Sequence, residues 1–207
     1  MNQRAEELIK EIQNQREMIL NSDIFGFFPE TKELTEQFFS DILDKKFENN
    51  HIYQMEADIV TSLARGAFVN INSYNKSERK LEIVAVAGIR EFVELILKFG
   101  NIRMVGKKLS LEDKFAELSL LQGKLHRIPR GLKDAALKGF PDMLVDLVDE
   151  MLGPFFCYGA GFVYQDELVG NLAIIGKNVD IQVEKEEVIN LLLPVFALVE
   201  MVYRDIN

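Results

Sequence analysis

The stretch FFCYGAGFVY-QDE-LVGNLAIIGK, residues 155–177, decides the fold. Two mostly apolar runs, 155–164 and 168–177, flank the polar tripeptide 165–167. Apolar runs separated by a short polar turn are typical of a β-hairpin. Glycine and alanine occupy the middle of both runs, and glycine inside a strand marks a bend or the close approach of another segment. The stretch therefore predicts a curved hairpin with a neighbour on its middle.

A long apolar helix is predicted directly after this hairpin, over 184–204. Its stripe at three- and four-residue steps consists of Val188, Leu191, Leu192, Val195, Leu198, Val199 and Val202. Pro194 removes one backbone hydrogen bond and predicts a bend. The stripe keeps close to a seven-residue spacing, which favours a parallel helical contact with a partner protomer. The alternative is a helix that packs only on its own sheet.

The rest of the chain alternates between helical and strand patterns. The expected elements are helices over 2–20, 32–47, 52–65, 91–99 and 111–121, strands over 67–74, 81–89 and 102–109, an extended segment over 124–128, and one or two short helices within 129–151. In the first strand Val69 and Ile71 share one face, whereas Asn70 and Asn72 share the other.

This order of elements predicts an α+β fold with a central antiparallel sheet of five or six strands. Helices from both chain ends would cover one face, and the helical insert 111–151 would cover the other and roof a cavity. We divide the chain into an N-terminal helical region, 1–50, and a domain that contains the sheet, 51–207.

The composition of the chain limits the kinds of molecule that we expect it to bind and the compartment in which we expect it. The 207 residues carry a formal net charge of −9, which argues against binding to nucleic acid and to anionic membrane surfaces. No apolar run reaches the ~20 residues needed to cross a bilayer, and the N-terminus lacks the layout of a secretion signal. The single cysteine, Cys157, excludes an intrachain disulfide and suits a reducing compartment. We expect a cytoplasmic protein.

Spacing of glycine and apolar residues from about residue 51 onwards resembles a known family. The residues concerned are Gly123-Lys124-Leu125, Gly131-Leu132, Gly139, Pro141, Leu152-Gly153, Tyr158, Gly161, Glu167-Leu168, Gly170-Asn171 and Ile174. They resemble GAF domains, the sensor fold related to PAS, and in particular the GAF domains of sensor histidine kinases from methanogenic archaea. The resemblance covers about three-quarters of the chain and involves no catalytic residue.

The resemblance implies a small-molecule sensor of the kind used in two-component signal transduction. Terminal helices would pair in a homodimer on one side of the sheet, and a ligand would sit on the other. The sequence up to Asn207 contains no ATP-binding glycine boxes and no phospho-acceptor region. We therefore expect a stand-alone or excised sensor without enzymatic activity.

Cys157 and His126 are the candidates for a cofactor. Some GAF relatives attach haem or a bilin through cysteine, so the resemblance makes Cys157 a candidate tetrapyrrole site. The alternative is a small buried residue in a strand, and we favour it because no basic neighbour in sequence lowers the thiol pKa. An axial haem-ligand role for His126 is a weaker idea. The cofactor, if any, stays unknown.

The densest basic segment of this acidic chain, 124–133, lies in the predicted insert. It contains His126, Arg127 and Arg130, which could clamp an anionic or carboxylate ligand. The alternative, which we favour, is a solvated basic surface. Together with Cys157 and Tyr158, these three residues form the predicted lining of the ligand pocket. Two further functions stay open at this stage: a ligand-free dimerisation module, and a haem or redox sensor.

Overall fold

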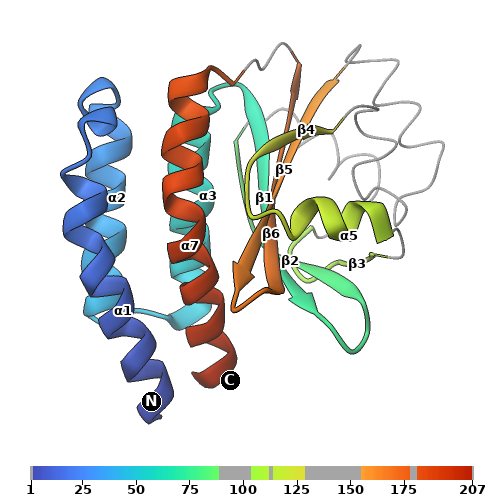
Figure 1. Cartoon of the computed structure of the whole chain (residues 1–207), viewed down its shortest axis with the longest axis horizontal. Helices are drawn as coiled ribbons and strands as arrows, with labels where there is room; N and C mark the ends of the chain where they lie inside the picture. The colour runs from blue at the N-terminus through green and yellow to red at the C-terminus, as the bar shows by residue number, and fades with distance from the viewer. Residues whose placement is uncertain (1, 89–103, 112–113, 129–154, 178–180, 207) are drawn as a thin grey trace.

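The computed structural model describes residues 2–88, 104–111, 114–128, 155–177 and 181–206. Within them lies a six-stranded sheet in the order β3-β2-β1-β6-β5-β4, in which every neighbouring pair is antiparallel (Figure 1). The strands are β1 (Ala67–Asn75), β2 (Lys80–Gly88), β3 (Lys108–Ser110), β4 (His126–Ile128), β5 (Phe155–Tyr164) and β6 (Glu167–Lys177). The predicted α+β class and antiparallel sheet are confirmed.

Helices from both chain ends lie on one side of the sheet. They are α1 (Gln3–Leu20), α2 (Pro29–Leu43), α3 (His51–Leu63) and α7 (Val183–Ile206), with short 3-10 helices η1 (Asp23–Phe27) and η2 (Glu48–Asn50) between them. α3 and α7 lie next to the sheet, and α1 and α2 form a second layer outside them (Figure 1). We call this side of the sheet the helix face and the opposite side the outer face.

The long helices begin where the sequence supplies a cap. The side-chain oxygen of Asn2 accepts a hydrogen bond of 2.8 Å from the Ala5 backbone nitrogen, which satisfies one of the free N–H groups at the start of α1. Pro29 stands in the first turn of α2, where its missing N–H costs nothing. This start lies three residues before the predicted one, at position 32.

The hydrophobic core runs without a break from α1 through α7 to the sheet. Phe196 of α7 is its centre: the Phe196 ring makes edge-to-face contacts with Phe38 of α2, at 5.8 Å, and with Phe162 of β5, at 5.7 Å. The apolar stripe of α7 is buried within this chain, from Val195 to Val199 without exception. α7 thus contacts helices on one side and the sheet on the other.

The two ends of the chain lie side by side (Figure 1). The Asn2 side-chain amide donates to the Asp205 backbone oxygen at 2.8 Å, and Arg4 pairs with the Asp205 carboxylate at 3.3 Å. α1 therefore begins against the last turn of α7.

The hairpin predicted from residues 155–177 is present as β5 and β6. Its turn consists of Gln165 and Asp166, both left-handed, with φ of 50° and 62°. Two successive left-handed residues are the geometry that matches the twist of the flanking strands. The pairing shifts register between Phe162 and Val163, so the hairpin is bent there.

One strand is shorter than predicted. We expected a strand over 102–109, but the described part of it is only β3, because the chain turns at Gly106, whose φ is +88°. The short helix α5 (Lys114–Leu120) falls within the helix predicted for 111–121 and lies on the outer face (Figure 1). The helix expected over 91–99 and the segment 129–151 lie outside the described residues.

Candidate functional site

Three asparagine side chains meet on the outer face of the two central strands. Asn70 and Asn72 come from β1 and Asn171 from β6, and we call them the asparagine cluster. All three are at least 93% buried. The Asn72 amide nitrogen donates to the side-chain oxygens of Asn70, at 3.1 Å, and of Asn171, at 2.9 Å. These amides therefore form a polar floor in the middle of the sheet.

The geometry and register of the strands explain why the three asparagine side chains meet. Successive side chains of a strand alternate between the two faces, so Asn70 and Asn72 share a face. In the register of the sheet Asn72 pairs with Asn171, and the side chains of an antiparallel pair point to the same side. The sequence separated these polar residues from Val69 and Ile71, but gave no sign that Asn171 joins them.

The hydrogen bonds of the asparagine cluster are incomplete. Both N–H bonds of the Asn72 amide are used, whereas its side-chain oxygen is buried and has no partner among the described residues. A buried polar atom without a hydrogen bond costs roughly 1–3 kcal/mol. Such an atom calls for an explanation, and a bound molecule with an N–H or O–H group supplies one.

Small residues surround the asparagine cluster on the outer face. Gly159 and Gly161 of β5 pair with Ala173 and Asn171, so these strand positions contribute no large apolar side chain, although the side chains of Ile128 and Leu120 lie over Gly159. Gly161 lies under the end of α5: an added Cβ would stand 2.0 Å from the Leu120 backbone oxygen. The close approach that the glycine-rich hairpin predicted is therefore the approach of α5.

The predicted site residues divide between the two faces. His126 pairs with Gly159, and Cys157 pairs with Ile128, so both lie on the outer face. Tyr158 belongs to the core on the helix face, where the Ile181 backbone nitrogen donates to its hydroxyl at 3.5 Å. Arg127 pairs with Tyr158, and its guanidinium lies 4.4 Å from the Phe156 ring centroid. Arg130 lies outside the described residues.

His126 contacts α5 through its imidazole ring. Its Nδ1 lies 3.2 Å from the Lys124 carbonyl oxygen, and its Nε2 lies 2.8 Å from the Ser119 hydroxyl. Because a carbonyl only accepts, Nδ1 is the donor to Lys124, and Nε2 is left to bond with the Ser119 hydroxyl. The imidazole thus joins β4 to α5. Cys157 is 1% exposed on the same face.

A second polar cluster, which the sequence did not predict, lies on the helix face. The Glu200 carboxylate of α7 is 1% exposed and accepts hydrogen bonds of 2.6 Å from Tyr53 of α3 and of 2.6 Å from Ser73 of β1. Arg204 donates to it at 3.0 Å. Glu56 of α3 is fully buried nearby, and neither of its oxygens has a partner among the described residues.

Burial governs the protonation of these acids. Burial, and then the neighbouring charge of Glu200, hold the pKa of Glu56 well above its usual range. Burial also raises the pKa of Glu200, although hydrogen bonds from Ser73, Tyr53 and Arg204 oppose the rise. Two carboxylates this deep do not both ionise readily, and Glu56, whose oxygens have no partner among the described residues, is the one that more readily keeps its proton.

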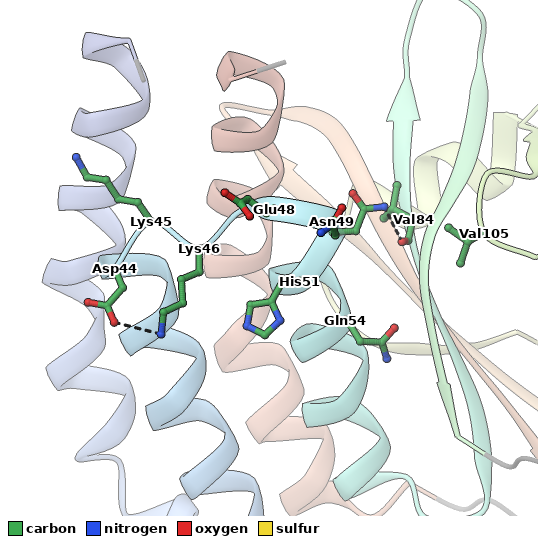
Figure 2. A pocket seen from close by; sticks show the side chains of 10 residues that line it. Asp44, Lys45, Lys46, Glu48, Asn49, His51, Gln54, Val84 and Val105 are labelled. Atoms are coloured by element: carbon green, nitrogen blue, oxygen red, sulfur yellow. Dashed lines mark hydrogen bonds and ion pairs between the residues drawn. The ribbon is translucent and has the colours of Figure 1, made fainter.

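An open hollow of about 770 Å³ lies beside the connection from α2 to α3. Figure 2 shows Lys46, Glu48 and His51 on one side of it and Val84 and Val105 on the other. Side-chain amides of α3 and its cap close the strand edge here, because Asn50 donates to the Val84 carbonyl at 3.2 Å and Gln54 donates to the Val86 carbonyl at 3.0 Å.

His51 and Asp41 at this hollow resemble part of a catalytic triad. The His51 Nε2 lies 2.7 Å from one Asp41 oxygen, and Lys46 donates to the other at 2.7 Å. No serine, cysteine or threonine is among the residues that line the hollow. Burial alone would raise the pKa of Asp41, but hydrogen bonds from Lys46, His51 and Gln37 outweigh it and lower the pKa to about 2. The arrangement stabilises the turn after α2, and the outer face remains the better site.

Comparison with known proteins identifies the fold. No protein-family model and no curated protein matches the sequence. Among solved structures, the GAF domain of a phosphoenolpyruvate-protein phosphotransferase from Coxiella burnetii matches with a TM-score of 0.59 and 14% identity, over 89% of this chain and 98% of that one. The GAF domain of the corresponding Acinetobacter protein matches with a TM-score of 0.54 and 12% identity, over 100% and 98%.

A GAF domain from a phytochrome shares the same fold. A phycocyanobilin-bound GAF domain from a cyanobacterial phytochrome matches with a TM-score of 0.58 and 13% identity, over 84% of this chain and 96% of that one. The chain therefore has the fold of GAF domains. At these identities the likeness concerns the fold alone. None of the helices in the described part of the chain is both long enough and apolar enough to cross a lipid bilayer.

Proposed function

We propose that this chain is a sensor domain that binds a small molecule on the outer face of its sheet and reports binding through α1 and α7. The observation that carries the proposal is the buried asparagine cluster on the face opposite the terminal helices. The GAF fold supports it, because the similar GAF domain of a cyanobacterial phytochrome is bound to phycocyanobilin. Function does not follow from fold alone, so the cluster bears the argument.

The asparagine cluster favours a neutral ligand that forms hydrogen bonds. The polar side chains of the asparagine cluster are amides, which carry no charge, and the unpartnered Asn72 oxygen requires a donor. An anion clamp through Arg127 receives no support, because this residue pairs with Tyr158 and contacts Phe156 instead. We propose that the ligand presents an N–H or O–H group to Asn72, with Cys157 and His126 at the border of the site.

The setting that we propose is two-component signal transduction, through a homodimer and without catalysis by this domain. It rests on the glycine and apolar spacing of the sequence, which resembles that of the GAF domains of archaeal sensor kinases. The apolar stripe of α7 is buried in its own chain, so a dimer through the terminal helices uses the outward side of α1. Light scattering at high concentration measures the oligomer, and a strict monomer would remove this part of the proposal.

Native mass spectrometry of freshly purified protein tests the binding proposal directly. We expect extra mass that disappears on denaturation, and the same preparation of Asn72→Leu should lack it. Asn14→Leu, at an exposed position in α1, is the control and should retain the mass. If wild type carries none, thermal unfolding is followed with 1 mM of each of a set of uncharged amides and heterocyclic bases. No shift with any member would sink the proposal. A Soret band in the purified protein would instead favour the haem sensor.

A further inference from the structure

Arg204 joins the last turn of α7 to the two central strands. Its Nη2 donates to the backbone oxygens of Tyr74, at 2.5 Å, and of Val169, at 2.6 Å. The ladder between β1 and β6 ends at Ser73 and Gly170, and in that register the next pair would be Tyr74 and Val169. The Arg204 guanidinium therefore donates hydrogen bonds to the two backbone carbonyls at the point where β1 and β6 stop pairing.

The same guanidinium is tied to the buried acid of its own helix. Arg204 Nε donates to Glu200 Oε1, which also accepts from Ser73, the residue before Tyr74. Charged hydrogen bonds that share a partner stabilise each other more than isolated pairs do, and the shared partner Glu200 is buried although Arg204 is partly exposed. α7 is thus fixed to β1 by two consecutive residues, through the Ser73 hydroxyl and the Tyr74 carbonyl.

Tyr74 is also held from the outer face. Its hydroxyl donates to Glu117 Oε1 of α5 at 3.2 Å, and Arg79 donates to the other Glu117 oxygen at 2.8 Å. The Tyr74 side chain is 3% exposed and has little room to move independently. One residue of β1 therefore contacts α5 through its side chain and α7 through its backbone.

We propose that Tyr74 couples α5 on the outer face to the end of α7 on the helix face. The groups concerned, in order, are Glu117, the Tyr74 hydroxyl, the Tyr74 carbonyl, Arg204 and Glu200. A displacement of α5 alters the position of Tyr74 and so the contacts of Arg204. As a route for signalling the coupling rests on the proposed function, but the coupling itself exists without a ligand.

Spatial contact alone does not establish coupling, so the test measures it. Glu117→Gln and Arg204→Lys are made singly and together, and the unfolding equilibrium is measured by denaturant titration. Glu117 and Arg204 have no contact, and uncoupled sites would give additive effects. We expect the double variant to depart from additivity by roughly threefold or more in the unfolding equilibrium constant. Lysine at 204 keeps the charge beside Glu200 and loses the fork onto two carbonyls.

Tyr74→Phe and Leu118→Ala are the matched controls. In the Tyr74→Phe background the hydroxyl contact is gone, and the non-additivity between positions 117 and 204 should vanish. Leu118 is exposed on α5 beside Glu117, and its variant should add independently to Arg204→Lys. Additive behaviour of Glu117→Gln with Arg204→Lys, or non-additivity that survives Tyr74→Phe, overturns the proposal.

Hydrogen exchange provides a second measurement, which does not depend on unfolding of every variant. Glu117→Gln should reduce the protection of amides in residues 199–203 of α7 at least threefold, whereas Leu118→Ala leaves it unchanged. Equal protection in both variants overturns the coupling. Neither experiment uses a ligand, so a failure here leaves the binding proposal standing, and an unoccupied, unresponsive site leaves the coupling standing.

Discussion

The side-chain amide of Asn72 donates to the side-chain oxygen of Asn171 at 2.9 Å, across two neighbouring strands and 99 residues of sequence. The same amide nitrogen also donates to the side-chain oxygen of Asn70. Asn72 is thus the only described donor to two buried side-chain oxygens, and its own oxygen has no partner in the described part of the chain. Polar contacts therefore join the two central strands at a buried position where apolar side chains would ordinarily pack.

Replacement of Asn72 by alanine should destabilise the fold. It leaves the side-chain oxygens of Asn70 and Asn171 without their donor, at a cost of about 1–3 kcal/mol in the free energy of unfolding. Denaturant titration measures this cost. Asn14→Ala, at an exposed position in α1, is the control and should change stability by less than about 0.5 kcal/mol. Equal effects of the two variants would refute a structural role for the cluster.

Gly161→Ala should disturb the packing of α5 on the sheet. The new Cβ would stand 2.0 Å from the Leu120 backbone oxygen, which cannot rotate away as a side chain could. We expect a loss of about 1–3 kcal/mol in unfolding free energy, as for other overpacked sites. Gly26→Ala is the control, since a Cβ there meets nothing within 4 Å. A Gly161 variant as stable as the Gly26 variant would contradict the close approach of α5.

Glu56 should make the protein less stable as pH rises. Its pKa is raised in the folded state, so above about pH 4.5 the folded protein keeps a proton that the unfolded chain has lost. Stability from this source is fully present below pH 4.5 and is lost toward the folded pKa, by at most about 1.4 kcal/mol per pH unit.

Glu56→Gln keeps the shape of the protonated acid and removes this dependence. We expect the variant to gain stability relative to wild type between pH 5 and pH 9, as measured by thermal unfolding across that range. Glu36→Gln, at an exposed position in α2, should follow the wild-type curve. Parallel curves for wild type and Glu56→Gln would show that Glu56 is ionised in the folded protein.

Asp41 gives the stability of the protein the opposite pH dependence. Its pKa falls from 3.8 to about 2 in the folded state, so its stabilisation is present above pH 3.8 and is lost as pH falls through about 2. Because Lys46 and His51 are half exposed, we expect only about 1 kcal/mol at pH 7. Asp41→Asn should lose this amount at pH 7 and match wild type near pH 2.

Asp44→Asn is the control for the acid titration. Asp44 is exposed and pairs with the same Lys46 at 3.3 Å, so it shares the local charge without the burial. Its removal should change stability little at either pH. An equal loss in the Asp41 and Asp44 variants would place the stabilisation in the surface charge of Lys46.

Periodicity in the sequence predicted most of the described elements. The three N-terminal helices, both hairpins and α7 follow from three- and four-residue or alternating apolar spacing. The strand β3 was overpredicted, because the apolar run before Lys108 contains the turn at Gly106. A run of apolar residues shows burial but does not distinguish a strand from a buried turn.

The site was harder to predict because it depends on which faces are covered. Alternation along β5 places Cys157 and Tyr158 on opposite sides of the sheet, so the two could not line one pocket as predicted from their adjacency. Alternation likewise placed Asn70 and Asn72 together, and the predicted insert 111–151 was expected to cover their face, but nothing in the sequence showed that Asn171 of β6 lies opposite Asn72.

No pattern in the sequence predicted the two buried acids of the helix face, Glu56 and Glu200. Glu56 and Glu200 stand in helices where glutamate is ordinarily solvent-exposed, and Glu200 meets Tyr53 across 147 residues. Only the packing of α3 against α7 brings them together. Sequence patterns report the burial of apolar residues, and a buried charge contradicts the pattern that would reveal it.

The contact between Asn2 and Asp205 makes the molecule suitable for circular permutation. A short glycine-serine linker would bridge the original ends, and new ends could be opened at the exposed turn of Gln165 and Asp166. In such a rearranged chain β5 and β6 would belong to opposite ends of the polypeptide. Fluorescent proteins attached there would sit at the tip of the central hairpin, where an optical biosensor could follow the bend of the sheet.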